Sequence, residues 1–159
     1  MKKNIQQPSP LILLSLLIFG CTVQKIIPSE ESTIEKIIEI PDRSKNELYI
    51  SANSWFVETF RSAESVIQFQ DKEAGKIMGK YVYFAQKGLS SIDIQQTISI
   101  DIKDNRVRVN INDPRYRLNG IAFIDYMPVN DRKTLDQVHV EWNKLIESLT
   151  SYLDKEVEW

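Results

Sequence analysis

The stretch that decides the fold covers residues 92–111 and reads IDIQQTISIDIKDNRVRVNI. Isoleucine occupies almost every second position of its first half, and valine or isoleucine occupies every second position after residue 106. Such alternation is typical of β-strands that have one buried and one solvated face. Asp104 and Asn105 lie between the two strands as a two-residue turn, so the stretch predicts a β-hairpin.

The turn at Asp104-Asn105 also fixes how the two strands pair. It places Lys103 opposite Arg106, and further along it places Asp101 opposite Arg108 on the solvated face. On the other face, the isoleucines of the first strand meet the valines of the second. A shift of one residue would expose the apolar side chains, so both faces specify the same register.

Two helices are expected on either side of this hairpin in the sequence. Ser44 and Glu47 form a capping box, and apolar residues follow at helical spacing, which predicts a helix that ends near Phe60. Apolar residues three and four apart predict a second amphipathic helix of ~20 residues over 135–153. The other expected features are strands at 33–40, 66–70 and 76–84, a polar loop at 86–91, an end of the central pair at Asp113-Pro114 and, as an option, a short strand at 121–126.

The resulting order of elements, β-α-β-β-β-β-α, indicates an α+β fold. The simplest arrangement that buries both apolar helix faces places two helices on one face of an antiparallel sheet of about five strands. Trp55 and Trp142 then belong to the core, because both lie on apolar helix faces.

The N-terminal residues carry a different kind of signal. Lys2 and Lys3 precede an apolar run at 11–19, which is too short to span a bilayer but fits the apolar segment of a secretory signal. The run is followed by Gly20 and by Cys21, the only cysteine of the chain.

The tetrapeptide Ile18-Phe19-Gly20-Cys21 resembles the lipobox of bacterial lipoproteins. The resemblance implies cleavage between Gly20 and Cys21 and diacylation of the Cys21 thiol, although Phe19 is bulkier than the residue often found before the glycine. It divides the chain into a signal peptide at 1–20, a lipidated cysteine and tether at 21–32, and a single domain at 33–159. A plain secretory signal and a buried apolar N-terminus are the alternatives.

The lipobox resemblance also implies a location. No aspartate follows Cys21 and no acidic run follows directly, so the chain lacks the inner-membrane retention signal and the surface-export signal of some lipoproteins. We therefore expect a cell-envelope protein held in the outer membrane by its lipid, with the periplasmic face favoured over the cell surface.

Four further features occur together in the domain. They are the strand before Pro41, Trp55 on the first helix, the run DKEAGKIMGK at 71–80 and the KDNR turn at 103–106. Over residues 38–120 these features resemble a bacterial lipoprotein domain family of unknown function with a TBP-like fold. The resemblance implies the fold and the location but supplies no catalytic residues, and a TBP-like topology does not by itself imply DNA binding.

Composition narrows the possible partners. The chain has 20 Lys+Arg and 22 Asp+Glu, and removal of residues 1–20 would take away Lys2 and Lys3 but no acid. An acidic balance argues against a nucleic-acid partner. One cysteine and one histidine exclude a disulfide framework and a Cys-rich zinc site, so we expect no metal and no cofactor.

A cluster of arginines surrounds Tyr116 in the sequence: Arg106, Arg108, Arg115 and Arg117. Guanidinium groups bind carboxylates and phosphates in a bidentate manner, so one hypothesis is an anion- or glycan-binding face. The alternative is an ordinary solvated sheet face on which Arg108 pairs with Asp101.

No catalytic constellation is visible in the sequence. His139-Val140-Glu141 matches the His-x-Glu of zinc deaminases, but no cysteine lies downstream, so we interpret His139 as a helix-surface residue. Asp71 and Glu73 are better explained as solvated turn residues than as an acid–base pair. The leading hypothesis is a lipid-anchored, non-enzymatic binding or assembly module with an envelope protein or a glycan as partner. An envelope hydrolase with a cryptic active site is the alternative.

Overall fold

The structure, a computed structural model, describes residues 29–60, 66–120 and 124–155. Its elements are η1 (Ser29–Ser32), β1 (Thr33–Glu39), α1 (Lys45–Thr59), β2 (Ile67–Asp71), β3 (Lys76–Lys87), β4 (Ser90–Lys103), β5 (Arg106–Leu118), β6 (Met127–Pro128) and α3 (Arg132–Leu153).

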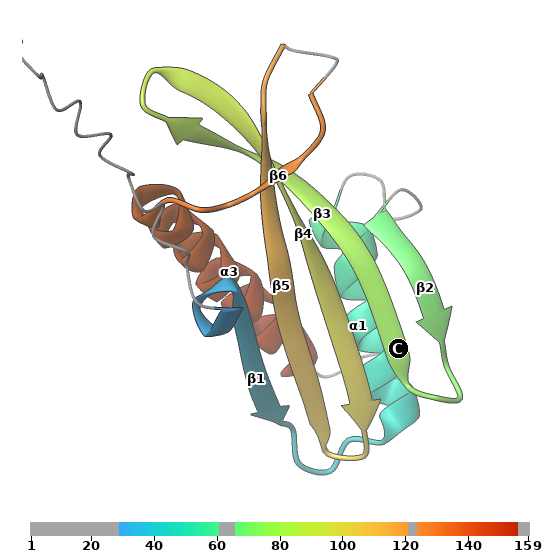
Figure 1. Cartoon of the computed structure of the whole chain (residues 1–159). Coiled ribbons are helices and arrows are strands. Elements are labelled where there is room, and N and C mark those ends of the chain that lie inside the picture. The colour runs from blue at the N-terminus through green and yellow to red at the C-terminus, as the bar shows by residue number, and fades with distance from the viewer. Residues whose placement is uncertain (1–28, 61–65, 121–123, 156–159) are drawn as a thin grey trace, which may run out of the picture.

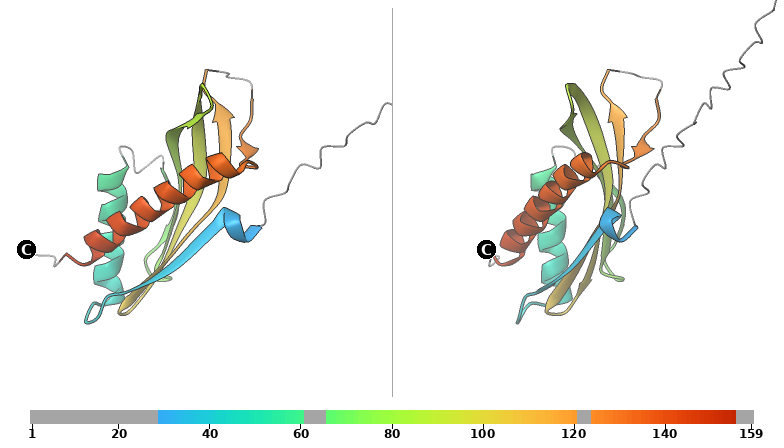
Figure 2. Two further views of the ribbon diagram at one scale, coloured as in Figure 1. Left: turned by 90° about the vertical axis from the view of Figure 1, so that its left-hand side faces the viewer. Right: turned by 60° about the vertical axis from the view of Figure 1, so that its left-hand side comes forward.

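The strands form one antiparallel sheet. Its order is β1-β5-β4-β3-β2, and the short β6 pairs with β5 (Figure 1). Both helices lie on the same face of the sheet, and the opposite face is left open (Figure 2). The predicted α+β fold, with two helices on one face of an antiparallel sheet, is confirmed.

The central hairpin has the predicted register. Lys103 pairs with Arg106 and Asp101 pairs with Arg108 across β4 and β5. Nη2 of Arg108 lies 2.9 Å from a carboxylate oxygen of Asp101. Asn105 adopts φ 63° in the turn, a conformation that asparagine tolerates better than most residues.

The pair does not end at Asp113-Pro114, so that prediction was wrong. The two residues together lie opposite Gln96 in a β-bulge, and β5 continues to Leu118. A bulge accommodates proline because the ladder does not need its missing N–H there. The Pro114 carbonyl instead accepts a hydrogen bond from the backbone N–H of Val129 over 3.0 Å.

The loop expected at 86–91 is also shorter than predicted. β3 extends to Lys87 and β4 begins at Ser90, so that only Gly88-Leu89 connects them. Gly88 has φ 64° at the first turn position, where a type II′ hairpin turn requires glycine. Of the optional strand at 121–126, residues 121–123 lie outside the described residues and 124–126 are not strand; the additional strand is β6.

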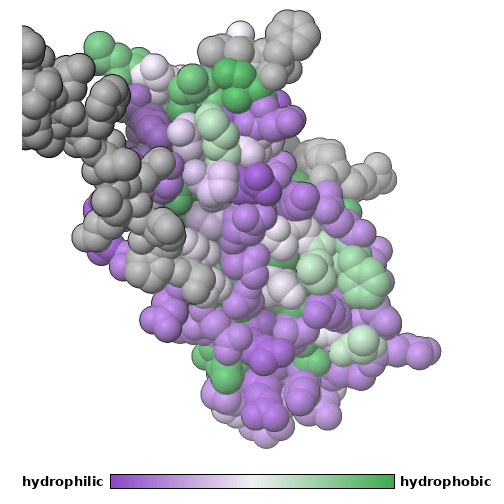
Figure 3. Space-filling model, viewed as in Figure 1, coloured by the Kyte–Doolittle hydropathy of each residue, from purple (hydrophilic) through white to green (hydrophobic). Residues whose placement is uncertain are grey.

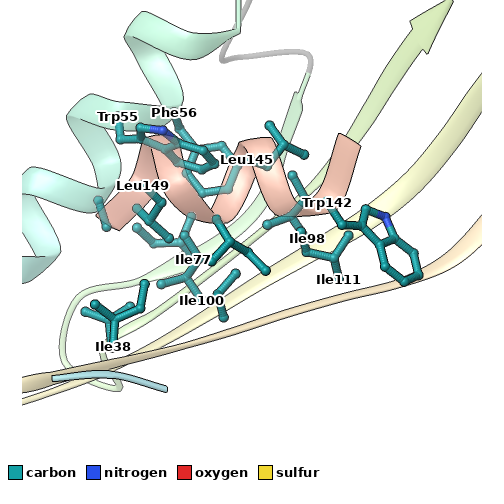
Figure 4. Close-up of a cluster of buried hydrophobic side chains, with 14 of the residues drawn as sticks. Ile38, Trp55, Phe56, Ile77, Ile98, Ile100, Ile111, Trp142, Leu145 and Leu149 are labelled. Atoms are coloured by element: carbon teal, nitrogen blue, oxygen red, sulfur yellow. The ribbon is translucent and has the colours of Figure 1, made fainter. Parts of the chain in front are cut away.

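The core lies between the sheet and the two helices (Figure 4). The capping box of α1 is present, with Ser44 and Glu47 bonded reciprocally, and the helix ends at Thr59. Trp55 and Trp142 are both buried, as predicted. Within the described residues, neither helix is long and apolar enough to cross a membrane.

One polar side chain interrupts the isoleucines on the buried side of β4. Gln96 is fully buried, and its Oε1 accepts a hydrogen bond from Nε1 of Trp142 over 2.6 Å. Its own Nε2 has no partner within the described part of the chain. The pair ties the centre of α3 to the centre of the sheet, opposite the bulge of β5.

The DKEAGKIMGK run forms the turn between β2 and β3. Oδ1 of Asp71 accepts a hydrogen bond from the backbone of Ala74 over 2.9 Å. Gly75 has φ 68°, and a Cβ at this position would lie 2.4 Å from the carbonyl oxygen of Ile102. The backbone N–H of Ile102 donates to the Gly75 carbonyl over 2.7 Å. This motif therefore serves the structure, because glycine alone allows the turn to approach β4 so closely.

Candidate functional site

No helix or strand of the described residues covers the face of the sheet opposite the two helices, and we call it the open face. The alternation along each strand directs the apolar residues to the helices and the polar residues to this face. Figure 3 shows a largely hydrophilic surface with scattered apolar spots. From β4 the open face receives Asp93, Gln95, Thr97, Ser99, Asp101 and Lys103.

A shallow hollow of about 230 Å³ lies at the end of the open face near the β4–β5 turn. It is lined by Ile37, Asp101, Lys103, Arg106 and Arg108, and we call it the basic hollow. The central hairpin supplies the charged residues, and β1 brings Ile37 directly opposite Arg108. Every lining residue thus belongs to a strand, which fixes the backbone positions around the hollow.

Positive charge exceeds negative charge in the basic hollow. Asp101 is shared between Arg108, at 2.9 Å, and Nζ of Lys76, at 3.6 Å. The hydrogen bond with Asp101 raises the pKa of Arg108, so its guanidinium stays charged. Among the described residues, Lys103 and Arg106 have no carboxylate oxygen within 4.0 Å of their nitrogens. Neither cation forms an ion pair in this part of the chain, and Glu39 of β1 lies directly opposite Arg106 across the β1–β5 pair.

The two remaining arginines of the sequence cluster lie elsewhere. Arg117 pairs with Asp93 at 3.0 Å, and its guanidinium lies over the ring of Tyr126, 4.8 Å from the centroid. Nη2 of Arg115 donates to the Tyr126 carbonyl over 3.0 Å. At ~3.3 Å per residue, Arg115 is roughly 20 Å along the strand from Arg108. The structure therefore brings Arg106 and Arg108 together, while Arg115 and Arg117 hold the segment before β6 against the sheet.

Sequence reasoning named some residues of the basic hollow and missed others. Lys103 could have been found, since the predicted register already placed it beside Arg106. Ile37 could not have been found from the sequence, because it reaches the hollow only through the pairing of β1 with β5. The same holds for Lys76, which reaches Asp101 only through the pairing of β3 with β4. Hydrophobic alternation does not reveal which distant strands become neighbours.

Residues 35–117 match the family model described as "Domain of unknown function (DUF4468) with TBP-like fold". The chain belongs to this family. Among curated proteins no sequence matches the chain.

Solved structures show the same fold for the DUF4468 domain. A crystal structure of a DUF4468 family protein from Bacteroides ovatus is similar with a TM-score of 0.66 at 12% identity, covering 84% of this chain and 93% of that chain. A crystal structure of a TBP-like protein from Parabacteroides distasonis is similar with a TM-score of 0.55 at 14% identity, covering 74% of this chain and 91% of that chain. At these identities the likeness establishes the TBP-like fold and nothing about ligands.

The other candidate residues of the DUF4468 domain have structural roles. Nε2 of His139 donates to the backbone carbonyl of Glu31 over 2.8 Å, and its ring packs on Trp142, so His139 fastens η1 to α3. Asp71 caps the β2–β3 turn, and Glu73 is exposed in that turn. In the described ranges, no group of three or more His, Cys, Asp and Glu side chains could hold a metal ion.

Two tyrosines on the helix-covered face have perturbed ionisation. Burial, together with the charge of Glu141, raises the pKa of Tyr81 to about 12. The same causes raise the pKa of Tyr83. Both phenols therefore stay neutral at physiological pH, which does not suit a general base.

Proposed function

We propose that the protein is a lipid-anchored envelope protein whose DUF4468 domain binds an anionic glycan at the basic hollow. The observation that carries the proposal is the pair Lys103 and Arg106, which line the hollow and have no carboxylate oxygen within 4.0 Å of their nitrogens among the described residues. Arginine in such a position can bind a carboxylate or a phosphate through two parallel hydrogen bonds.

The surroundings of the basic hollow suit a sugar polymer. Ser99, Thr97 and Asn110 continue the open face beyond it, and their side chains can donate to and accept from sugar hydroxyls. The hollow is shallow, so a chain can lie across the sheet while its acidic groups reach the cations. A glycan fits these features better than a small molecule, which favours an enclosed pocket.

The lining of the basic hollow supports binding over hydrolysis. Serine, cysteine and histidine are missing from the residues that line it. The carboxylate of Asp101 is already paired with Arg108 and Lys76, so it is not a free acid–base group. A hydrolase would need an activated nucleophile beside a base, or a pair of free carboxylates.

Lipidation of Cys21 would place this face close to a membrane. Residues 21–28 precede the first described residue, and a fully extended chain spans at most about 3.5 Å per residue. Residue 29 would then stay within roughly 30 Å of the bilayer, which raises the effective concentration of the domain at the membrane. The sequence after Cys21 favours the periplasmic face of the outer membrane as the location.

Metabolic labelling tests the anchor. Cells that express the full chain are fed an alkyne fatty acid, and the protein is then coupled to a fluorophore and separated on a gel. We expect label on the native chain and on the matched Thr22→Ala variant, and none on Cys21→Ala. Equal labelling of Cys21→Ala and the native chain would rule out this attachment.

A binding assay tests the basic hollow. Polygalacturonate, with one carboxylate per sugar, is titrated against the domain from residue 29 onward, with uncharged dextran as the comparison. If each exposed contact contributes ~0.5 kcal/mol or more, Lys103→Gln/Arg106→Gln should weaken binding about fivefold to tenfold. The control Lys36→Gln/Lys133→Gln removes the same charge from exposed positions outside the open face and should have a much smaller effect. Equal losses in both double variants would show that only net charge matters.

A further inference from the structure

The outer edge of β3 is open beyond the end of β2. β2 pairs with Lys76–Gly79 only, whereas β3 continues to Lys87. In the described portion of the chain, no strand pairs with the outer edge of residues 80–87. Such an edge presents unpaired N–H and C=O groups to any second strand, so proteins usually shield it.

Two contacts show which backbone groups point to this edge. The side chain of Gln137 on α3 accepts from the Gln86 N–H over 3.4 Å and donates to the Gln86 carbonyl over 3.0 Å. Across the hairpin, the carbonyl of Ser91 accepts from Asn119 and so points away from Gln86. Gln86 and Ser91 are therefore a non-hydrogen-bonded pair, and the groups two and four positions earlier on β3 also point outward.

These earlier positions are Val82 and Phe84, and their side chains are exposed on the open face. Their exposed fractions are 43% and 76%. The other two edges of the sheet have recognised shields: β2 is short and irregular between Ile67 and Phe69, and β1 carries the exposed charge of Lys36. The β3 edge carries the exposed charge of Lys80 at one end and is capped by Gln137 at Gln86, but between them it exposes the apolar side chains of Val82 and Phe84.

We propose that the β3 edges of two copies of the chain pair in an antiparallel manner about Tyr83, which joins two sheets into one. In this register Val82 lies opposite the partner's Phe84, and both pairs exchange their outward backbone hydrogen bonds. Lys80 lies opposite the partner's Gln86, so like charges do not face each other. The Tyr83 hydroxyl, buried and without a hydrogen-bond partner among the described residues, would lie close to the two-fold axis.

The register explains why a second copy, and not an arbitrary strand, fits this edge. Pairing about Tyr83 places Val82 of each copy opposite Phe84 of the other copy, so two apolar contacts form across the two-fold axis. The segment is therefore complementary to itself. The amide of Gln137 occupies the edge groups of Gln86, which limits the paired segment to the apolar positions. This surface is separate from the basic hollow, so the proposal does not depend on glycan binding.

Photo-crosslinking in cells tests the dimer on the full chain. Two copies with different tags are expressed together, with p-benzoylphenylalanine replacing Phe84. We expect a crosslinked product that carries both tags. The matched control places the same residue at Ile37, which is 52% exposed on the open face but belongs to β1 at the other edge of the sheet, and it should give at least tenfold less product. Absence of the mixed product at position 84, or equal product at both positions, would overturn the proposal.

A second measurement uses the full chain purified in a mild detergent. Sedimentation velocity should show a dimer whose dissociation constant rises at least tenfold in Val82→Lys, because lysine at an edge opposes strand pairing. Ile37→Lys, at the other edge of the sheet, should leave the dissociation constant unchanged. A chain that remains monomeric at high micromolar concentration, or a dimer that responds equally to both variants, would also overturn the proposal.

Discussion

Removal of the indole N–H of Trp142 should reveal how strongly the buried amide of Gln96 depends on it. The two side chains meet at 2.6 Å between α3 and β4, and both are fully buried. In Trp142→Phe, the Gln96 amide loses its partner, at a cost of about 1–3 kcal/mol. The smaller ring also leaves a cavity that costs about 1 kcal/mol. The free energy of unfolding should therefore fall by about 2–4 kcal/mol.

The matched variant is Gln96→Leu. It leaves the Trp142 N–H without an acceptor, but it also removes the amide nitrogen that has no partner within the described residues. These effects oppose each other, so we expect a loss of about 0–2 kcal/mol. Replacing both residues by apolar groups should cost about 1 kcal/mol, which is less than the sum of the single losses.

Urea unfolding of the domain from residue 29 onward, followed by far-UV circular dichroism, measures these losses. With a slope near 1.5 kcal/mol per molar urea, a loss of 3 kcal/mol moves the midpoint by about 2 M. With the middle values of these ranges, the double-mutant cycle should give a coupling of about 3 kcal/mol. Additive losses, with a coupling near zero, would refute the view that this hydrogen bond ties α3 to the sheet.

Three further predictions concern the same domain. Gly75→Ala should reduce the free energy of unfolding by at least about 2 kcal/mol, as measured by urea unfolding. The added Cβ would clash with the carbonyl oxygen of Ile102, and alanine would also have to adopt a positive φ. A loss below about 0.5 kcal/mol would contradict this reasoning. Hydrogen bonds from Ser44 lower the pKa of Glu47, so the contribution of this carboxylate to stability should be complete above pH 4.5 and should be lost as the carboxyl protonates at lower pH. Glu47→Gln should therefore reduce the acid-induced fall of the urea unfolding midpoint. An unchanged fall in this variant would contradict the prediction. Burial raises the pKa of Tyr81 from 10 to about 12, so the free energy of unfolding should fall between pH 10 and pH 12, because the phenol ionises first in the unfolded chain. Tyr81→Phe should show a smaller fall over this range. An equal fall would contradict a raised pKa at Tyr81.

Much of the central hairpin could be predicted from the sequence because two independent patterns specify it. The apolar residues at alternate positions and the turn at Asp104-Asn105 require the same register, and Asp101 meets Arg108 only in that register. The capping box at Ser44 was equally local. A local feature is therefore predictable where two independent patterns agree on it.

The errors arose where a local signal had a different structural consequence. Pro114 by itself predicts the end of a strand, but in the structure it lies in a β-bulge opposite Gln96 and the strand continues. The Pro114 carbonyl accepts a hydrogen bond from the N–H of Val129. The polar residues around Gly88 predict a loop at 86–91, but a single glycine at φ 64° allows a tight two-residue turn. Single-residue signals of this kind do not distinguish a break from a bulge.

The candidate site was less predictable than the fold because it combines strands that are distant in the sequence. Arg106, Arg108 and Asp101 come from one hairpin, and their proximity follows from its register. Ile37 joins them only after β1 pairs with the far side of β5. Arg115 is distant from Arg108 because β5 runs from Arg106 to Leu118. The sequence did not predict this length, because Pro114 predicts an earlier end of the strand.

The central claim is that an anionic glycan binds the basic hollow, and amide chemical-shift mapping tests it most directly. Polygalacturonate fragments are titrated into the ¹⁵N-labelled domain from residue 29 onward while ¹H–¹⁵N spectra are recorded. The account predicts that the largest shift changes occur at Ile37, at 101–108 and at the neighbouring positions of the open face, and that they disappear in Lys103→Gln/Arg106→Gln. Changes confined to the helices or to the outer edge of β3, or a spectrum unchanged at millimolar ligand, would contradict the claim.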